Sequence, residues 1–554
     1  MEKRTVLALV LVALVVIITP KLFPTPQRAG PTAVPSPVDS ASSPAPRAPT
    51  AIQRPAPESV AVSPEPAVAG RPETVTAASR PESVTVADSV SQTTFSTAGG
   101  SLLRVELKGY RALDKTERNV ALTTGSSPLV SYRVLGQADT TDLNQHLLAV
   151  EQSAGVTRFT AEIEGRAVDI TYRAVADSFV TRVSGSIRAN AESSPARFLL
   201  IDLPQTLVSF EADSNADYGS LAYAIKPGEK SAEGIPFRSL DPGEREIVTG
   251  PVTWSVAKNK YFMVGLLAPE GNQQFIEAHV IGGPRVASNA TLARGTVVAQ
   301  LGPDGAFSFD LYTGPQQYER LRSLGRDFDN SNPYGGWMQA VVQPFATIVM
   351  RILLWMKSTL GWSYGWLLIL FGVAVRLILW PLNQGAMRSS MKMQRIQPEL
   401  NAIQQKYKAD PQRLQTEMMK VYKEHGMSPF SAFSGCLPLL IPMPVLFALF
   451  FVFQNTIEFR GVPFLWLTDI SLKDPFYIIP LFMGLSMFGL SWIGLRNVPP
   501  NPQAKMMAYV MPVMMTVLFA NFASGLNLYY AVQNVAALPQ QWLIAHERAK
   551  ANKK

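Results

Sequence analysis

The stretch Trp362–Leu382 reads WSYGWLLILFGVAVRLILWPL, and its twenty-one residues carry one charge, at Arg376. As an α-helix it rises ~1.5 Å per residue, or ~31 Å in all, which is enough to cross the hydrocarbon core of a bilayer. We therefore expect a transmembrane helix. An arginine inside such a helix is costly and usually faces protein or water. In the alternative interpretation the long side chain of Arg376 reaches the headgroups, because it lies near the inner end of the stretch.

The composition of the chain also indicates a membrane protein. Only 17% of its 554 residues are charged, against ~25% in soluble proteins. The single cysteine, Cys436, cannot form an intramolecular disulfide, and the four histidines lie outside the apolar stretches. The net charge of +8 comes from basic residues that gather beside apolar stretches, which favours anionic lipids as partners over nucleic acid. We expect no metal site and no cofactor.

Residues 1–23 have the shape of a signal sequence, with Lys3 and Arg4 before the apolar run VLALVLVALVVIIT. Because no A-x-A-like cleavage site follows, we expect an uncleaved signal anchor with a cytoplasmic N-terminus; a cleaved signal is the alternative. Residues 24–95 contain fourteen prolines and a tetrad of the form P-E-S/T-V, repeated from Pro57, Pro72 and Pro81. This composition predicts an extended periplasmic linker.

Residues 96–330 are expected to form an all-β periplasmic sandwich domain. Alternating runs rich in β-branched residues occur at 102–107, 158–163, 168–173 and 296–301, with turn residues between them. A short helix is expected at 316–324. This part of the sequence has no nucleophile elbow, metal-ligand spacing or phosphate loop, so it favours a binding or spacer domain over an enzyme.

Residues 333–360 are predicted to form an interfacial amphipathic helix instead of a membrane span. The segment carries Gln339, Gln343, Arg351 and Lys357 among apolar residues. If it crossed the membrane, the loop 383–432 would lie outside the cell with eight basic and four acidic residues. That arrangement would contradict the positive-inside rule.

The predicted fold is a multi-span α-helical membrane protein with six transmembrane helices and the inserted all-β domain. A five-helix core at 361–545 would follow the N-terminal anchor, and the basic tail 546–554 would lie in the cytoplasm. Both termini would then be cytoplasmic and residues 24–360 periplasmic. The five expected core spans are 362–382, 436–457, 475–495, 506–522 and 526–544.

The cytoplasmic loop 383–432 is predicted to form a helical hairpin. Asp410 and Pro411 supply an N-cap and a first-turn proline, Gly426 ends that helix, and another helix is expected at 398–408. Exposed methionines suit adaptable apolar contacts with partners. The alternative is that they pack the hairpin against itself and the headgroups. The candidate contact residues are Met387, Met391, Met418 and Met419.

Polar residues inside the last span follow one helical face. Asn527, Tyr530, Asn534, Ala537 and Gln541 are spaced by three, four, three and four residues. One interpretation is hydrogen bonding between membrane helices. We favour a water-accessible groove, because buried amides and charge usually line a cavity. Further polar residues for this groove are Arg376, Gln454, Asn455, Thr516 and Asn521.

Several motifs of the chain are found in order in one known family. They are Asp310-Leu-Tyr-Thr-Gly-Pro, Pro333-Tyr-Gly-Gly-Trp, Gln397-Pro-Glu, Gly435-Cys-Leu-Pro-Leu-Leu-Ile-Pro-Met-Pro, Asp474-Pro-Phe-Tyr-Ile-Ile-Pro and Phe522-Ala-Ser-Gly-Leu-Asn-Leu-Tyr-Tyr, together with the arginine span that ends Trp380-Pro-Leu. With these motifs the chain resembles the YidC membrane protein insertases over most of 300–545. The resemblance is weaker over 95–330 and absent from the linker.

The resemblance implies a non-enzymatic insertase and chaperone of the inner membrane, with a groove open to the cytosol and the lipid. It implies that Arg376 makes this groove positive and that the span with Tyr529 and Tyr530 contacts the substrate. At Gly372 some relatives are expected to carry a hydroxyl residue. Nascent membrane proteins, the Sec translocon and, through basic loops and the tail, ribosomes are the implied partners. The candidate groove residues are Arg376, Gln454, Asn455, Thr516, Tyr529, Tyr530, Gln533 and Asn534.

Two other classes of function fit parts of the sequence. A secondary transporter would use Arg376 as an anion site, but the two halves show no repeat of hydropathy. A membrane-anchored periplasmic binding protein would work through the β domain. An intramembrane protease is poorly supported, because the spans contain no serine and histidine pair.

Overall fold

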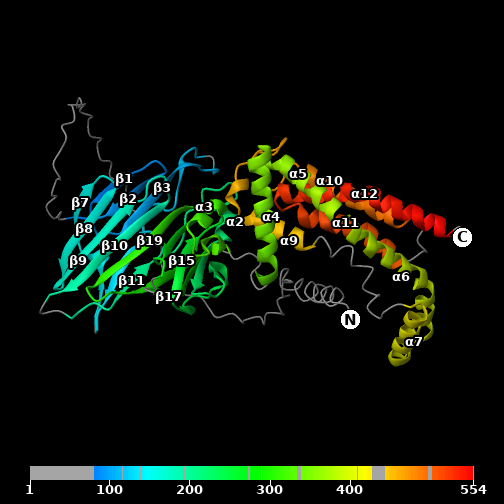
Figure 1. The fold of residues 1–554 in the computed structure, drawn as a ribbon, viewed down its shortest axis with the longest axis horizontal. Coiled ribbons are helices and arrows are strands. Elements are labelled where there is room, and N and C mark those ends of the chain that lie inside the picture. The colour runs from blue at the N-terminus through cyan, green and yellow to red at the C-terminus, as the bar shows by residue number, and fades with distance from the viewer. Residues whose placement is uncertain are drawn as a thin grey trace, which may run out of the picture. The chain divides into compact units, whose positions relative to one another are not determined.

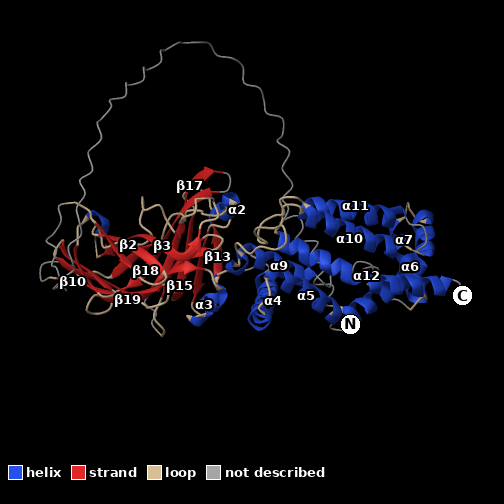
Figure 2. Ribbon diagram, turned by 90° about the horizontal axis from the view of Figure 1, so that it is seen from above, coloured by secondary structure: helices blue, strands red, loops and turns tan. Residues whose placement is uncertain are grey.

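The computed structural model describes residues 80–114, 116–137, 139–190, 194–271, 275–287, 290–332, 339–408, 410–426, 443–496 and 502–552. Strands fill this range up to residue 315, and long helices fill it from residue 339 (Figures 1 and 2). The expected anchor 1–23 and the first part of the linker lie outside the described residues.

The described strands form three antiparallel sheets, referred to below as the β domain. Their strand orders are β1-β2-β3-β4, β13-β12-β15-β16-β19-β10-β9-β8-β7 and β14-β17-β18-β11-β5-β6. The bounds are β1 Ser83–Ala87, β2 Ser91–Ser96, β3 Leu102–Arg111, β4 Asn119–Ala121, β5 Ser131–Leu135, β6 Thr140–Asp142, β7 Ala149–Ser153, β8 Val156–Ile163, β9 Arg166–Ala174, β10 Val180–Ala189, β11 Phe198–Asp202, β12 Ala222–Pro227, β13 Glu233–Pro236, β14 Arg245–Thr249, β15 Val252–Lys258, β16 Phe262–Leu267, β17 Phe275–Ala287, β18 Ala290–Gln300 and β19 Ala306–Pro315.

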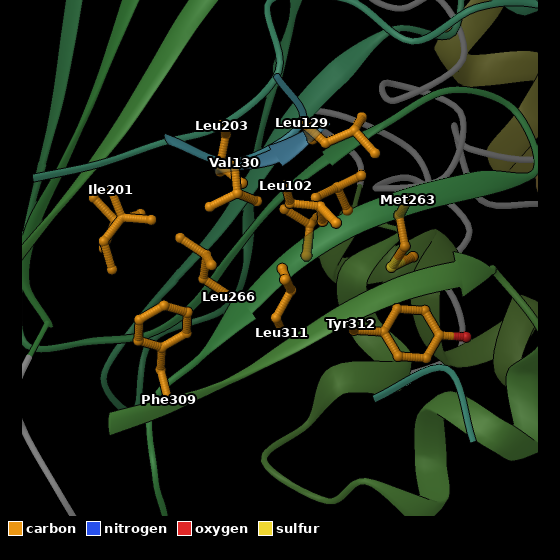
Figure 3. Packing of buried hydrophobic residues seen from close by; sticks show 14 of the residues in the cluster. Leu102, Leu129, Val130, Ile201, Leu203, Met263, Leu266, Phe309, Leu311 and Tyr312 are labelled. Atoms are coloured by element: carbon orange, nitrogen blue, oxygen red, sulfur yellow. The ribbon is translucent and has the colours of Figure 1, made fainter. Parts of the chain in front are cut away.

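One apolar core joins the three sheets. It contains Leu102 of β3, Ile201 of β11, and Leu266 and Leu311 of two neighbouring strands, all at most 1% exposed (Figure 3). Alternate residues of an antiparallel strand point to one face, so the alternating sequence runs supply the buried side chains. The all-β character expected of this region is confirmed, and the four predicted runs lie within or largely within β3, β8, β9 and β18.

The predicted boundary between linker and β domain, at residues 95–96, is wrong. The first sheet already begins with β1, which pairs antiparallel with β2, and Val84 and Val86 pack against the apolar core. Thr85 stands between these valines, and β1 is an edge strand with one exposed side. Such a short strand without aromatic residues differs little in composition from the linker before it.

The helical region comprises eight long described helices. α5 and α10 both pack against α12, α10 also packs against α11, and α4 packs against α9. Gly361, with φ +69°, separates α4 from α5, at a position where a left-handed residue commonly ends a helix. The bounds are α4 Gln339–Leu360, α5 Tyr364–Ile378, α6 Trp380–Lys406, α7 Pro411–Glu424, α9 Met443–Asn455, α10 Ile478–Gly494, α11 Pro502–Phe519 and α12 Ser524–Asn552. Two shorter helices, α2 Ser214–Tyr218 and α3 Tyr318–Ser323, belong to the β domain.

Helix boundaries differ from the sequence prediction most clearly in three places. The span expected at 362–382 is divided, because α5 ends at Ile378 and α6 begins at Trp380. The first hairpin helix, expected at 398–408, is the end of α6, which begins at Trp380 and has Pro398 inside it. α12 continues to Asn552, so most of the basic tail is helical. In the last two places the helix continues through polar sequence, because only the face that packs on the protein or the lipid has to be apolar. The predicted N-cap is confirmed, because the Asp410 carboxylate accepts from the Arg413 amide at 3.1 Å.

Among the described residues, no single helix is both long enough and apolar enough to cross a membrane. Val342–Leu360 and Tyr364–Ile378 reach the required length and mean hydropathy only together, and the chain bends by 119° between them. Shorter apolar helices occur at Met443–Phe453, Ile478–Gly494 and Ala508–Phe519.

The loop between α9 and α10 is anchored in the β domain. Ile457 joins the apolar core, and the Arg460 guanidinium donates to both carboxylate oxygens of Glu211 at 2.8 and 2.9 Å. The Tyr261 hydroxyl contacts the Ser471 hydroxyl at 3.0 Å. The same loop holds α12, because the Gly525 amide donates to the Ile470 carbonyl at 2.9 Å.

Two carboxyl groups in this loop contact have raised pKa values. Burial raises the pKa of Glu211 to about 7, and the Arg460 charge only partly opposes this effect. Burial also raises the pKa of Glu458 to about 7. Its Oε1 accepts from the Tyr318 amide at 3.0 Å, and its Oε2 has no partner among the described residues. Burial therefore shifts both carboxyl groups toward the neutral form, since desolvation penalises the charge.

Candidate functional site

Arg376 lies in the last turn of α5 and faces the protein interior. Arg376 is 8% exposed. One terminal nitrogen of its guanidinium donates to Oε1 of Gln540 on α12 at 3.0 Å. Its Nε is buried and has no hydrogen-bond partner among the described residues. No acidic side chain of the described residues forms a salt bridge with it. The charge is thus held by a neutral acceptor.

A second polar contact joins the same two helices one turn of α5 earlier. Nε2 of Gln533 donates to the Gly372 carbonyl at 2.8 Å and to the Tyr529 hydroxyl at 3.1 Å. α5 and α12 lie close together here: a Cβ atom added at Gly372 would lie 3.0 Å from the side chain of Val532. Glycine at this position lets α12 approach α5 closely enough for the Gly372 carbonyl to accept from Gln533.

Two of the predicted groove residues on α12 face other helices. Asn534 donates to the Ser486 hydroxyl at 3.1 Å and to the Met483 carbonyl at 3.4 Å, both on α10. The Tyr530 ring stacks on Phe519 of α11, with ring centroids 5.5 Å apart. The Asn534 contacts are hydrogen bonds between helices, which is the alternative that the sequence left open.

The remaining predicted residues are not brought to Arg376 by any described contact. Asn455 donates to Phe451 of its own helix at 3.0 Å, and Thr516 donates to the Pro512 carbonyl at 2.7 Å. The side chain of Gln454 lies outside the described residues. Of the candidate groove set, the structure therefore brings Arg376, Tyr529 and Gln533 to the contact between α5 and α12.

The hairpin of α6 and α7 has a small core of its own. Ile396 and Leu400 of α6 pack with Val421 and Tyr422 of α7. The partly buried Met418 and Met419 pack against this core, while the side chains of Met387 and Met391 lie outside the described residues.

Sequence reasoning missed Gln540 and Asn383, which are each 1% exposed. Gln540 lies seven residues after Gln533, so this spacing would have placed both on one helical face. Asn383 follows Arg376 by seven residues, and neither of its amide atoms has a partner among the described residues. Among the residues that the structure describes, no cluster of three His, Cys, Asp or Glu side chains is suited to bind a metal ion.

The outer surfaces of α4 and α11 carry large apolar side chains. On α4 they include Ile348, Ile352 and Trp355, which are 53%, 38% and 65% exposed, at helical spacing. On α11, Val513 and Val517 are 65% and 68% exposed. Large exposed apolar surfaces mark contact with protein or membrane.

Two family models match the chain. The model described as 60Kd inner membrane protein matches residues 355–552, and the model of the YidC periplasmic domain matches residues 83–348. Together they define an inner membrane protein that carries a periplasmic domain, which is the β domain described above.

Individual relatives extend this result over most of the chain. The membrane protein insertase YidC of Chlorobium phaeovibrioides is 30% identical over 504 residues, which cover 83% of this chain and 83% of that protein. YidC of Burkholderia lata is 28% identical over 480 residues, 83% of this chain and 82% of that protein. A crystal structure of an active YidC insertase with its first transmembrane domain resolved covers 85% of this chain and 95% of its own, at 20% identity and a TM-score of 0.35. The chain belongs to the YidC family of membrane protein insertases, as its motifs predict.

Proposed function

We propose that this chain inserts transmembrane segments of nascent membrane proteins into the inner membrane and shelters them as a chaperone. Polar flanks of the substrate would pass along the contact between α5 and α12, while apolar segments leave into the lipid. The observation that carries this proposal is Arg376, a buried charge whose described partner is the neutral Gln540. Such a group is available to an acidic substrate flank.

The charge of Arg376 is of the right size for this task. An acidic side chain at the bilayer centre meets a barrier of about 2.5–3.5 kcal/mol on insertion scales. A guanidinium ~5 Å away, at an effective dielectric constant of ~20, offers roughly 3 kcal/mol of attraction. One arginine thus offsets most of the barrier for one carboxylate. Lysine would serve nearly as well, because attraction at this distance needs charge more than bidentate geometry.

The proposed topology has six spans, with both termini in the cytoplasm and residues 24–360 in the periplasm. α4 would lie in the interface: its exposed face is apolar, its opposite face packs on α9, and Arg351 donates to the Tyr318 hydroxyl of the β domain at 2.9 Å. The 119° bend before α5 supports this assignment. We further propose that the hairpin 383–432 receives substrates, and that basic loops and the tail contact anionic lipid and ribosomes, with the Sec translocon as a partner.

The experiment uses the purified chain in proteoliposomes and two matched substrates, one with an acidic and one with a neutral translocated tail. Protease protection of the tail measures insertion. We expect Arg376→Lys to insert both nearly normally and Arg376→Ala to slow the acidic substrate at least about tenfold more than the neutral one. Equal loss for both would mean that Arg376 only holds or hydrates the helices. No loss for either would support the interpretation in which its side chain reaches the headgroups.

A photo-crosslinker separates the polar contact from the lipid-facing surface. Placed at Gln533, it should capture a ribosome-held nascent membrane protein. The matched control is the exposed Val517 on α11, where we expect mainly lipid adducts. Equal capture at both positions would contradict a defined path beside α5 and α12.

A further inference from the structure

The orientation of the Gln540 side chain is fixed by two different contacts. Its Oε1 accepts from the Arg376 guanidinium at 3.0 Å, and its Nε2 donates to the Trp380 carbonyl at 3.0 Å. Rotating the amide by half a turn would place two donors together at Arg376 and two acceptors together at Trp380. At 1% exposure no bulk water can compensate for such a mismatch.

The Trp380 carbonyl lies at the junction between α5 and α6, next to Pro381, which has no N–H to donate. Gln540 therefore bridges the guanidinium, this junction and α12. The guanidinium is held from the side of its terminal nitrogen, and its Nε has no partner among the described residues. Gln540 thus fixes the position of Arg376 without neutralising its charge.

We propose that Gln540 is a positioning residue that presents Arg376 to acidic flanks of the substrate without cancelling its charge. This inference rests on the proposed function and deepens it. An amide oxygen can accept the hydrogen bond as well as a carboxylate oxygen can, but it adds no negative charge. A glutamate in the same place would form an ion pair with Arg376, and the pair would no longer attract a carboxylate of the substrate.

The neutral acceptor also explains how a buried arginine is retained without an acidic partner. A guanidinium hydrogen-bonded to a neutral amide is partly desolvated and partly compensated, so an incoming carboxylate gains more from it than from an arginine that is already paired. Since Nε2 of Gln540 is committed to Trp380, the amide cannot turn to bind the substrate itself. Its effect on insertion then passes through Arg376.

The test compares Gln540→Glu and Gln540→Leu with the wild-type protein in proteoliposomes, using matched substrates with acidic, neutral and basic translocated tails. We expect Gln540→Glu to slow the acidic substrate by about tenfold, to the level of Arg376→Ala, and to leave the neutral one unchanged. Gln540→Leu, which frees the guanidinium, should slow the acidic substrate by about threefold. Adding Gln540→Glu to Arg376→Ala should cost the acidic substrate little more.

The matched control is Gln384→Glu. Gln384 lies near the same junction and accepts from the Trp380 indole at 3.0 Å, but it makes no described contact with Arg376. The same change of charge there should leave the preference among tails as in the wild type. A comparable loss in Gln384→Glu would show a general effect of negative charge near the junction and would overturn the inference.

Four other outcomes would contradict the inference or the proposed function on which it rests. Equal slowing of acidic and neutral substrates by Gln540→Glu and Gln540→Leu would mean that Gln540 only holds the helices together. If Gln540→Glu does not accumulate in the membrane, the test is made with Gln540→Leu alone and combined with Arg376→Ala. Additive losses of insertion in the double variant would contradict an effect of Gln540 through Arg376. If the wild-type chain inserts no substrate, the proposed function itself fails. If the wild-type chain inserts all substrates and Gln540→Glu inserts the acidic substrate as fast as the wild type does, only this inference fails.

Discussion

In the β domain the large apolar side chains lie inside, whereas in α4 to α12 many of them lie on the surface. Among the described residues of the β domain, large apolar side chains are exposed at Val175, Ile247 and Val286. On α11 alone, Tyr509, Val513 and Val517 belong to a longer exposed apolar face. The interior of the helical region instead contains Arg376 and several amides.

This difference shows that the two regions fold against different surroundings. Water drives the apolar residues of the β domain into a common core. In a bilayer the hydrocarbon is as apolar as leucine, so helices gain little by hiding leucine and gain more by pairing polar groups with one another. The contact of α5 and α12 therefore combines structural bonds, such as Gln533 to Gly372, with a charge that the proposed function uses.

The largest expected effect is in the β-domain core. Phe309 is 1% exposed and contacts the rings of Phe275 and Phe307. Phe309→Ala should destabilise this domain by about 3–5 kcal/mol, through lost burial and a residual cavity. Hydrogen exchange of the full chain measures the loss. Protection should fall in β16 to β19 and persist in α10 and α12; a fall in both regions would mean that they unfold as one unit.

Next in size is a matched pair of exposed positions. Val513→Lys, at the middle of the proposed span 506–522, should cost about 2.5–3.5 kcal/mol if this face of α11 contacts lipid at the bilayer centre. Ile247→Lys on β14, at a similarly exposed position, should change stability by about 0.5 kcal/mol or less. The measurement is denaturant unfolding in detergent micelles or bicelles for both variants. Equal small effects would contradict a lipid-facing α11.

The loop between the two regions should respond to pH. Because the folded-state pKa of Glu458 is raised to about 7 from the ordinary value of 4.5, the folded loop binds a proton more tightly than the unfolded one. Its stability should then fall as pH rises from about 5 to 8, by on the order of 2 kcal/mol. Hydrogen exchange of residues 457–474 at several pH values measures this change.

Glu458→Gln should reduce the pH dependence and leave the part that comes from Glu211, whose pKa is also about 7. The matched control is Glu162→Gln at an exposed position of β8, which should keep the wild-type profile. A loop that becomes more protected as pH rises would show that the ion pair of Glu211 with Arg460 outweighs the desolvation of both carboxyl groups.

Sequence patterns predicted which residues share a face but not which helix that face meets. The alternating runs were sufficient for the strands of the β domain, because strand period and burial are local properties. On α12 the spacing of Tyr530 and Asn534 gave a correct polar face, yet that face packs on α10 and α11. Gln540 gained its importance only from tertiary contact with Arg376 and Trp380, which lie more than 150 residues earlier in the sequence.

The smallest expected effect tests the polar interior itself, at Asn383. Both atoms of its amide are buried without a partner among the described residues, a state that costs free energy unless water or a substrate supplies the bonds. Asn383→Leu should therefore raise stability by about 1 kcal/mol and slow insertion of polar-flanked substrates by about twofold. Denaturant unfolding and protease protection measure the two effects on the same preparation. A loss of stability would mean that the Asn383 amide is already satisfied in the folded protein. The interior of the helical region would then be as closely paired as Tyr172 of the β domain, whose hydroxyl contacts both Tyr132 and the Gly100 carbonyl.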